Sequence, residues 1–179
     1  LDPANWDRED HSQAAGQLCQ RGAVGATPGG QGVVEGGPIP YKPDALAKKK
    51  ANFANRLALD PEVKCYMPGI PRATYMPFPF QIVQSPVMIL MAYEFASADR
   101  VINMGKPVEP AVDTWMGTAN GRWDGDTLVV DNRGFVDGTW FDRAGNFHSD
   151  QLHVIERFTL TDPDHIQYEA TIEDPQVFT

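Results

Sequence analysis

The chain has 179 residues, of which 42% are hydrophobic, and a formal net charge of −9 at pH 7. This length and apolar content suit one domain with a sizeable core. The negative charge argues against nucleic acid as a partner, because binding a phosphate backbone normally uses a clustered basic face. The one basic run, Lys48–Lys50, is interpreted as the solvated face of a helix. No stretch approaches the roughly 18 to 20 consecutive apolar residues of a membrane-spanning helix, so we expect a soluble chain.

Residues 1–43 are predicted to form an N-terminal arm. The segment Gly22–Pro43 is rich in glycine and proline, which cannot sustain regular structure. The sequence starts at Leu1 without an initiator Met, which suits a periplasmic or secreted protein whose signal peptide has been removed. Cys19 and Cys65 are compatible with one disulfide in an oxidising compartment, the preferred interpretation, and also with two buried thiols.

Residues 44–179 are predicted to form a single domain that begins with a helix. Asp44 is a suitable N-cap, the helix is expected to run to about Leu59, and Asp60-Pro61 would end it. The residues expected on its apolar face are Leu46, Phe53 and Leu57.

The next segments are predicted to be a loop and three strands. Prolines keep Cys65–Arg72 extended, and this loop could fold beneath the barrel as a plug. The strands are expected at Phe80–Gln84, Val87–Phe95 and Arg100–Met104. Because Val87–Phe95 opens with a nearly continuous apolar run, we expect it to be covered on both faces.

The last third of the chain contains three β-rich ribbons, Trp115–Gly134, Phe147–Thr159 and His165–Phe178. Asp124-Gly125 in the first ribbon suits the positive φ angles of a tight hairpin, and Thr161–Asp164 is expected to turn the chain between the last two. In Phe147–Thr159 both alternating sets mix polar and apolar residues, so the pattern leaves its inward face open.

These features predict a mainly β protein, with about seven to nine strands and one firm helix. Successive strands joined by short turns favour an antiparallel up-and-down barrel, lipocalin-like (calycin-like), over a two-sheet sandwich. Closing the sheet is an economical way to remove exposed strand edges.

Seven short motifs are distributed along the chain: Cys65–Arg72, Trp115–Gly117, Gly121–Asp131, Thr139–Asp142, Gly145–Ser149, Glu156–Phe158 and Glu173–Pro175. Together they resemble a large group of exported proteins from soil-type bacteria, most of them uncharacterised. The resemblance covers roughly residues 33 to 179, and it implies export and a β-rich fold without supplying a reaction. In that group the chain usually continues past the position of Thr179.

Acid–base groups are the first candidates for chemistry. His148 with Asp142 or Asp150, and Glu94 beside Tyr93, are predicted to be catalytic, because a histidine near neutral pKa beside a carboxylate can move protons. The alternative is that Glu94 and Glu156 form structural ion pairs with an arginine, which could be Arg100, Arg122, Arg157 or Arg72.

A metal site is a weaker alternative to a protein without a cofactor. His148 and Asp150 lie two apart on one predicted strand, within reach of one zinc or copper ion. A further ligand would have to come from another strand, with Glu94, Asp142 or Glu169 available.

A binding cavity lined by aromatic and methionine side chains is the remaining candidate feature. Its predicted ligand-binding residues are Arg72, Arg100, Trp115, Trp123, Trp140, Tyr168 and Met91, with an arginine reaching a carboxylate or phenolate. The leading hypothesis is an exported barrel enzyme, a lyase, isomerase or hydrolase, acting by acid–base chemistry on an apolar or aromatic small molecule. The alternatives are a non-catalytic carrier of such a molecule and a metal-dependent enzyme using His148, and a homodimer is left open.

Overall fold

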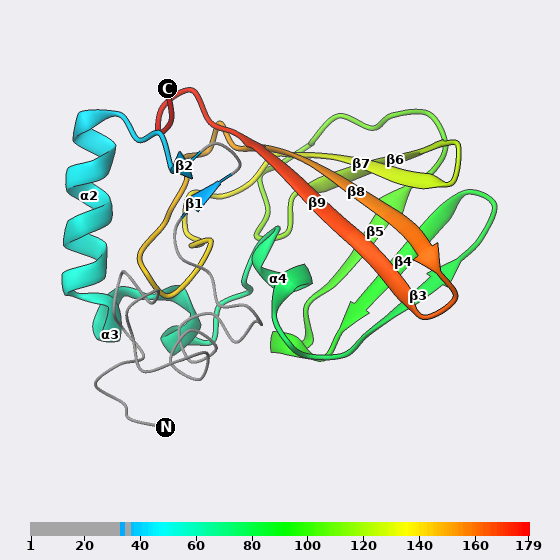
Figure 1. The fold of residues 1–179 in the computed structure, drawn as a ribbon, viewed down its shortest axis with the longest axis horizontal. Helices are drawn as coiled ribbons and strands as arrows, with labels where there is room; N and C mark the ends of the chain where they lie inside the picture. Colours follow the sequence, from blue (N-terminus) through cyan, green and yellow to red (C-terminus); the bar gives the residue numbers. More distant parts are fainter. Residues whose placement is uncertain (1–32, 35–36) are drawn as a thin grey trace.

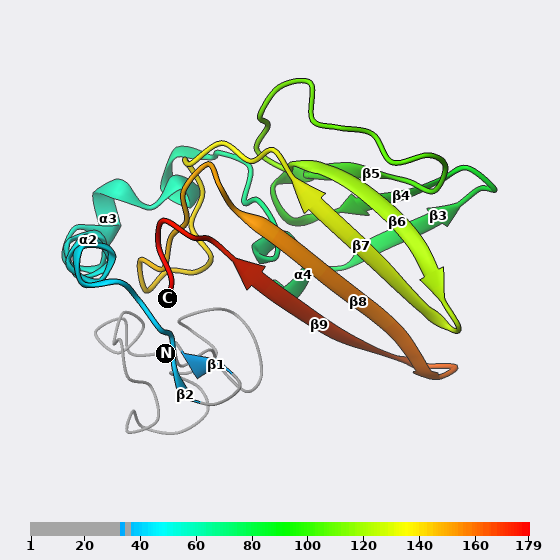
Figure 2. The ribbon, with the colours of Figure 1, turned by 90° about the horizontal axis from the view of Figure 1, so that it is seen from above.

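A computed structural model describes residues 33–34 and 37–179 of the chain. Its main element is a seven-stranded sheet with the strand order β3-β4-β5-β6-β7-β8-β9. Figures 1 and 2 show the sheet curling into a half-barrel, with β3 and β9 at its two edges. The predicted mainly β, barrel-like class is therefore confirmed. The strands are β3 (Phe80–Gln84), β4 (Met88–Tyr93), β5 (Asp99–Asn103), β6 (Thr118–Asp124), β7 (Thr127–Arg133), β8 (His153–Asp162) and β9 (His165–Glu173).

One strand pair departs from the predicted up-and-down order. All neighbouring strands of this sheet are antiparallel except β5 and β6, which are parallel with Ile102 opposite Ala119. Parallel neighbours need a crossover connection, and residues 104–117 provide it. The alternation of apolar residues predicts a strand but says nothing about its direction, so the sequence pattern could not show this pair.

The two hairpin turns lie close to their predicted positions. The β6–β7 turn is Gly125-Asp126, one residue later than expected, with Gly125 at a φ of 59°. Pro163-Asp164 connects β8 to β9. The predicted strand boundaries around β8 and β9 were wrong at their outer ends: β8 begins at His153 rather than Phe147, and β9 ends at Glu173 rather than Phe178.

The concave face of the sheet holds the main core. In β8 the inward set is Val154, Glu156 and Phe158, which resolves the ambiguity of that strand. In β4, Ile89, Met91 and Tyr93 face the same interior. The other face of β4 is less covered than predicted, since Met88 is exposed and Leu90 and Ala92 are half-buried.

The short helix α4 (Arg72–Tyr75) fills part of this interior, and Figure 2 shows it on the concave side of the sheet. Ile70 and Ala73 belong to the main core cluster, so the predicted plug exists at the end of Cys65–Arg72. The start of that loop, Cys65–Met67, is exposed.

A helical region stands beside the sheet, on the left in Figure 1. It consists of α2 (Pro43–Ala54), α3 (Arg56–Leu59) and the 3₁₀ helix η2 (Pro61–Lys64), so the predicted helix is interrupted at Asn55. The helix begins at Pro43, whose fixed φ suits the first helical position, and Asp44 is therefore in the first turn rather than the N-cap.

The buried face of α2 differs from the predicted one. Ala45, Lys49 and Asn52 are buried, whereas Leu57 is 78% exposed and Leu46 is 38% exposed. Asn52 donates a hydrogen bond to the carbonyl of Gly145 at 3.3 Å, so this face packs against a polar loop. The basic run is consequently not a uniformly solvated face.

Short contacts between the two ends of the described chain anchor α2. The Lys42 amide donates to the carbonyl of Val177 at 3.0 Å, and the Thr179 amide donates to Pro40 at 2.9 Å. The rings of Tyr41 and Phe178 lie 5.1 Å apart. Behind them lies a second apolar cluster made of Ala45, Trp140, Phe147 and Val177.

Of the predicted N-terminal arm, only its last part is described, as the two-stranded ladder β1 (Val33–Val34) and β2 (Gly37–Pro38). Cys19 lies outside the described residues, so its pairing with the exposed Cys65 stays a prediction.

Another 3₁₀ helix, η3 (Phe95–Ser97), connects β4 to β5.

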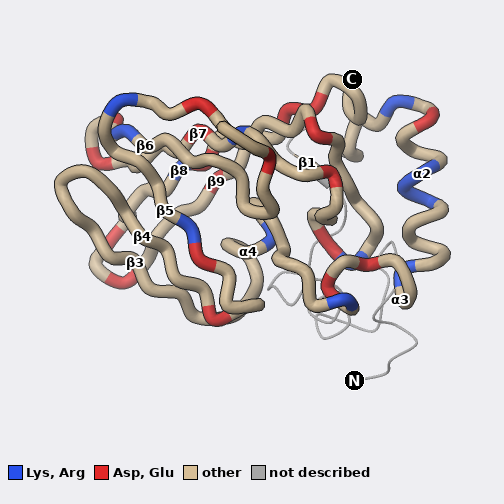
Figure 3. The backbone as a smooth tube through the Cα atoms, turned by 180° about the vertical axis from the view of Figure 1, so that it is seen from behind, with Lys and Arg blue, Asp and Glu red and all other residues tan. Residues whose placement is uncertain are grey.

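The helices of the described part are too short and too polar for any of them to cross a membrane. Figure 3 shows basic residues along α2, which lies at the opposite end of the molecule from the strand hairpins.

Candidate ligand-binding site

Several predicted site residues meet inside the curled sheet, around Glu156 of β8. This carboxylate is fully buried and accepts hydrogen bonds from Arg100 at 2.5 and 3.1 Å, Asn132 at 2.9 Å and Tyr168 at 2.8 Å. Met91 also contacts Arg100, with its sulfur 3.2 Å from Nη2. Of the structural ion pairs offered as the alternative, the one between Glu156 and Arg100 is therefore present, whereas Glu94 forms none within the described residues.

The electrostatics of this group favour a closed structural network. Burial raises the pKa of Tyr168 well above its ordinary value, and Glu156 acts in the same direction. Burial likewise raises the pKa of Tyr93, which pairs with Thr74 at 3.0 Å. Burial acts to lower the pKa of Arg100, but the charge and hydrogen bonds of Glu156, together with the nearby Tyr93 and Tyr168, outweigh burial and leave that pKa above its ordinary value. Tyr93 and Tyr168 consequently stay neutral, and Arg100 stays charged beside Glu156.

Arg72, predicted to contact a ligand, is instead paired inside the protein. It is 2% exposed and forms hydrogen bonds to Asp60 at 3.0 and 3.2 Å and to Glu62 at 2.6 Å. Glu62 also accepts from Arg143 at 2.9 and 2.6 Å. This network connects η2 and α4 to the loop that follows β7.

The predicted catalytic residue Asp142 organises that loop. Its carboxylate accepts from the amides of Ala144 at 2.9 Å and Asn146 at 3.3 Å, and from the Asn146 side chain at 2.6 Å. Burial raises the pKa of Asp142 despite these bonds. No bond joins Asp142 to His148 in the described structure, so the predicted pair is not formed there.

His148 is fully buried between two partners. Its Nδ1 lies 2.8 Å from the carbonyl of Ser149, which can only accept, so Nδ1 carries the proton. Nε2 lies 2.5 Å from the Thr139 hydroxyl and accepts from it in the neutral ring. Burial lowers the pKa of His148, which agrees with a neutral imidazole.

The remaining predicted residues are apart from one another. Glu94, Asp150 and Trp123 are exposed, and His148 and Asp150 lie before β8 rather than on one strand. Both ring nitrogens of His148 are occupied, and no group of His, Cys, Asp and Glu within the described residues is arranged to hold a metal ion.

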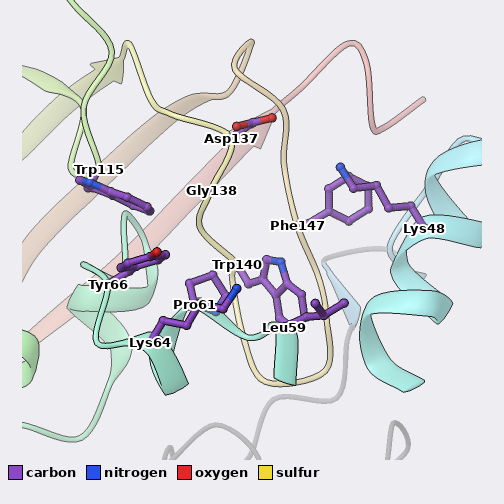
Figure 4. Close-up of a pocket in the computed structure, with 10 residues that line it drawn as sticks. All are labelled: Lys48, Leu59, Pro61, Lys64, Tyr66, Trp115, Asp137, Gly138, Trp140 and Phe147. Carbon is purple, nitrogen blue, oxygen red and sulfur yellow. The ribbon is translucent and has the colours of Figure 1, made fainter. Parts of the chain in front are cut away.

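A surface pocket of about 240 Å³ brings together two of the predicted ligand-binding residues, Trp115 and Trp140. Figure 4 shows it between the helical region and the loop that follows β7. The rings of Trp115 and Tyr66 lie 4.9 Å apart and are tilted by 39°. The full set of lining residues is Lys48, Leu59, Pro61, Lys64, Tyr66, Trp115, Asp137, Gly138, Trp140 and Phe147.

Burial differs between the two sides of the pocket. Trp140 is 8% exposed and Phe147 is 4% exposed, whereas Tyr66 is 46% exposed. The indole of Trp140 forms no hydrogen bond within the described residues, and Figure 4 shows its nitrogen toward the middle of the pocket, where the N–H can donate to a bound molecule. The pocket thus combines aromatic surfaces with an unused donor.

Sequence reasoning missed most of this pocket. The sequence pattern places Lys48 on a solvated helix face and Tyr66 in an extended loop, and it gives Lys64 no role in binding. The signal that existed was the aromatic content of the Tyr66 and Trp115 motifs, but nothing in the spacing shows that these segments meet.

The protein is thus a mainly β half-barrel with an aromatic-lined pocket between its sheet and a helical region. A comparison with protein-family models, curated proteins and solved structures found no match for the chain.

Proposed function

We propose that the protein binds a small planar molecule in the pocket between Tyr66, Trp115 and Trp140, as a non-catalytic carrier. The observation that carries this proposal is the convergence of four aromatic side chains on one cavity. Aromatic walls with a few polar groups are the usual composition of small-molecule sites. In this proposal the protein is exported, as the sequence motifs imply.

The size of the pocket limits the ligand. Its volume of about 240 Å³ is below the roughly 300–1,000 Å³ of sites for drug-sized ligands. A molecule of one or two fused rings fits this space.

Acid–base catalysis on the same ligand is the second candidate. It is favoured by the titratable side chains of Lys64, Tyr66 and Asp137 at the pocket. None of the four predicted catalytic residues, His148, Asp142, Glu94 and Tyr93, lines this cavity, and binding is therefore placed first.

Removing one aromatic wall tests the binding proposal. Tyr66→Ala should weaken the binding of a fused-ring ligand such as 2-naphthamide by about two- to tenfold, because an aromatic pair contributes roughly 0.5–1.5 kcal/mol. Isothermal titration calorimetry measures the affinity. Tyr66 is exposed, so its replacement should leave the fold intact.

Trp123→Ala is the matched control, since Trp123 is a 51% exposed aromatic residue that does not line the pocket. Its affinity should equal that of the wild type. Equal losses in both variants, or no binding by the wild type, would refute the proposed site.

A further inference from the structure

The pocket contains two lysines from different elements, Lys48 of α2 and Lys64 of η2. Figure 4 shows them approaching from opposite sides. The ammonium of Lys48 lies 4.4 Å from the centre of the Phe147 ring. Within the described structure neither lysine forms an ion pair with a carboxylate. Both charges are therefore available to a ligand.

The local charge contrasts with that of the whole chain. The chain carries a formal charge of −9, whereas the pocket has Lys48 and Lys64 against the single carboxylate of Asp137. Asp137 lies at the upper edge of the group in Figure 4, above both Trp140 and Lys64. A pocket with a net positive lining attracts an anion and disfavours a cation.

The uncharged polar groups favour the same kind of ligand. The indole N–H of Trp140 can only donate a hydrogen bond, and Figure 4 shows its nitrogen on the side that faces the middle of the pocket. The ammonium groups of Lys48 and Lys64 are also donors only. A ligand rich in acceptors can accept hydrogen bonds from all three groups, whereas a neutral hydrocarbon can accept none.

We infer that the pocket selects a planar aromatic anion of one or two rings, such as an aromatic carboxylate. Its ring would lie against Tyr66 and Trp115, and its carboxylate would take Lys48 or Lys64 as the charge partner. This inference rests on the proposed function, because it specifies the ligand of the same site.

Three probes of the same size test the charge preference: 2-naphthoate, the neutral 2-naphthamide and the cationic 2-naphthylmethylammonium. Calorimetric titration of the full chain should give at least about tenfold tighter binding for 2-naphthoate than for 2-naphthamide, with the ammonium weakest. Raising the salt concentration from about 0.05 to 0.5 M should reduce the difference, because exposed charges are screened.

The double variant Lys48→Gln/Lys64→Gln should lose the preference for 2-naphthoate and keep the affinity for 2-naphthamide. Lys50→Gln is the control, since Lys50 is an exposed lysine of α2 that does not line the pocket. It should retain the preference of the wild type.

The outcomes separate the two proposals. If the wild type binds all three probes equally, or if the double variant keeps the preference, the anion inference is overturned and the binding function stands. If the wild type binds none of the probes, the proposed function fails together with the inference.

Discussion

At the residue scale, His148 is a neutral imidazole held by Thr139 and Ser149. Its pKa in the folded state is lowered from the ordinary value of 6.5, with burial as the main cause. Above about pH 6.5 the ring is neutral in both the folded and unfolded states. As the pH falls below that value, the unfolded chain binds a proton that the folded chain does not bind, so stability decreases until the folded pKa is reached.

The variant His148→Gln removes this titration. We expect the stability advantage of the wild type over the variant to shrink between pH 7 and pH 5, by at most about 1.4 kcal/mol per pH unit. Urea unfolding followed across this range measures the difference. A difference that stays constant with pH would show that the buried ring is not kept neutral.

The sequence identifies His148 and Glu156 as residues of interest more easily than it identifies their hydrogen-bond partners. The sequence singles out both residues and offers Arg100 among the arginines that could pair with Glu156, whereas the bond of His148 to the Ser149 carbonyl is visible only in the structure. These partners lie on other elements or in irregular backbone. Alternation along a strand contains no information about them.

At the element scale, the ion pair of Arg100 and Glu156 connects β5 to β8, which are not neighbours in the sheet. Glu156→Leu leaves the Arg100 guanidinium buried without its partner, and we expect a loss of roughly 3–5 kcal/mol. The double variant Arg100→Met/Glu156→Leu should be more stable than the sum of the single losses predicts, because no charge is left unpaired. Urea unfolding of the four proteins measures the coupling.

The exposed pair of Arg157 and Asp124, at 3.2 Å, is the control for that cycle. Surface pairs contribute about 0–1 kcal/mol, so its coupling should be near zero. Strictly additive losses at Arg100 and Glu156 would contradict the structural role assigned to them.

Elements bounded by strong turn signals were predicted well. The strand Phe80–Gln84 was predicted residue for residue, because Pro79 and Ser85-Pro86 mark its ends. The predicted start of β8 was too early because Phe147–Leu152 contains no glycine or proline that would mark a boundary. In the structure, Ser149 of this segment is bonded to Asp174 at 2.6 and 2.8 Å, a contact that no local pattern indicates.

At the scale of the whole molecule, Phe178 and Tyr41 hold the helical region against the sheet region. Phe178→Ala should loosen α2, so the amides of α2 should exchange with solvent faster while those of β7 and β8 stay protected. Because Lys48 of α2 lines the pocket, the affinity for 2-naphthoate should also fall. Hydrogen exchange followed by mass spectrometry measures the first effect and calorimetry the second.

Phe78→Ala is the control, since the Phe78 ring packs on Phe95 at 5.2 Å, away from α2. Faster exchange in α2 should be absent from this variant. If Phe178→Ala leaves α2 exchange unchanged, the contact does not anchor the helix.

The barrel-like class could be predicted at this scale because strands and turns alternate regularly along the chain. The pocket could not, because its walls come from α2, from Leu59–Tyr66, from Trp115 and from the loop after β7. Only tertiary packing brings these segments together.

The two edges of the half-barrel differ in their resistance to strand addition. Among the described strands, β3 and β9 each have one neighbour in the sheet. β9 carries Glu169 and Glu173, and charges on an edge strand discourage pairing with another chain. Phe80–Gln84 of β3 contains no charged residue, so its free backbone groups offer the less protected rim. Self-association at high concentration, if it occurs through an edge, should therefore start at β3.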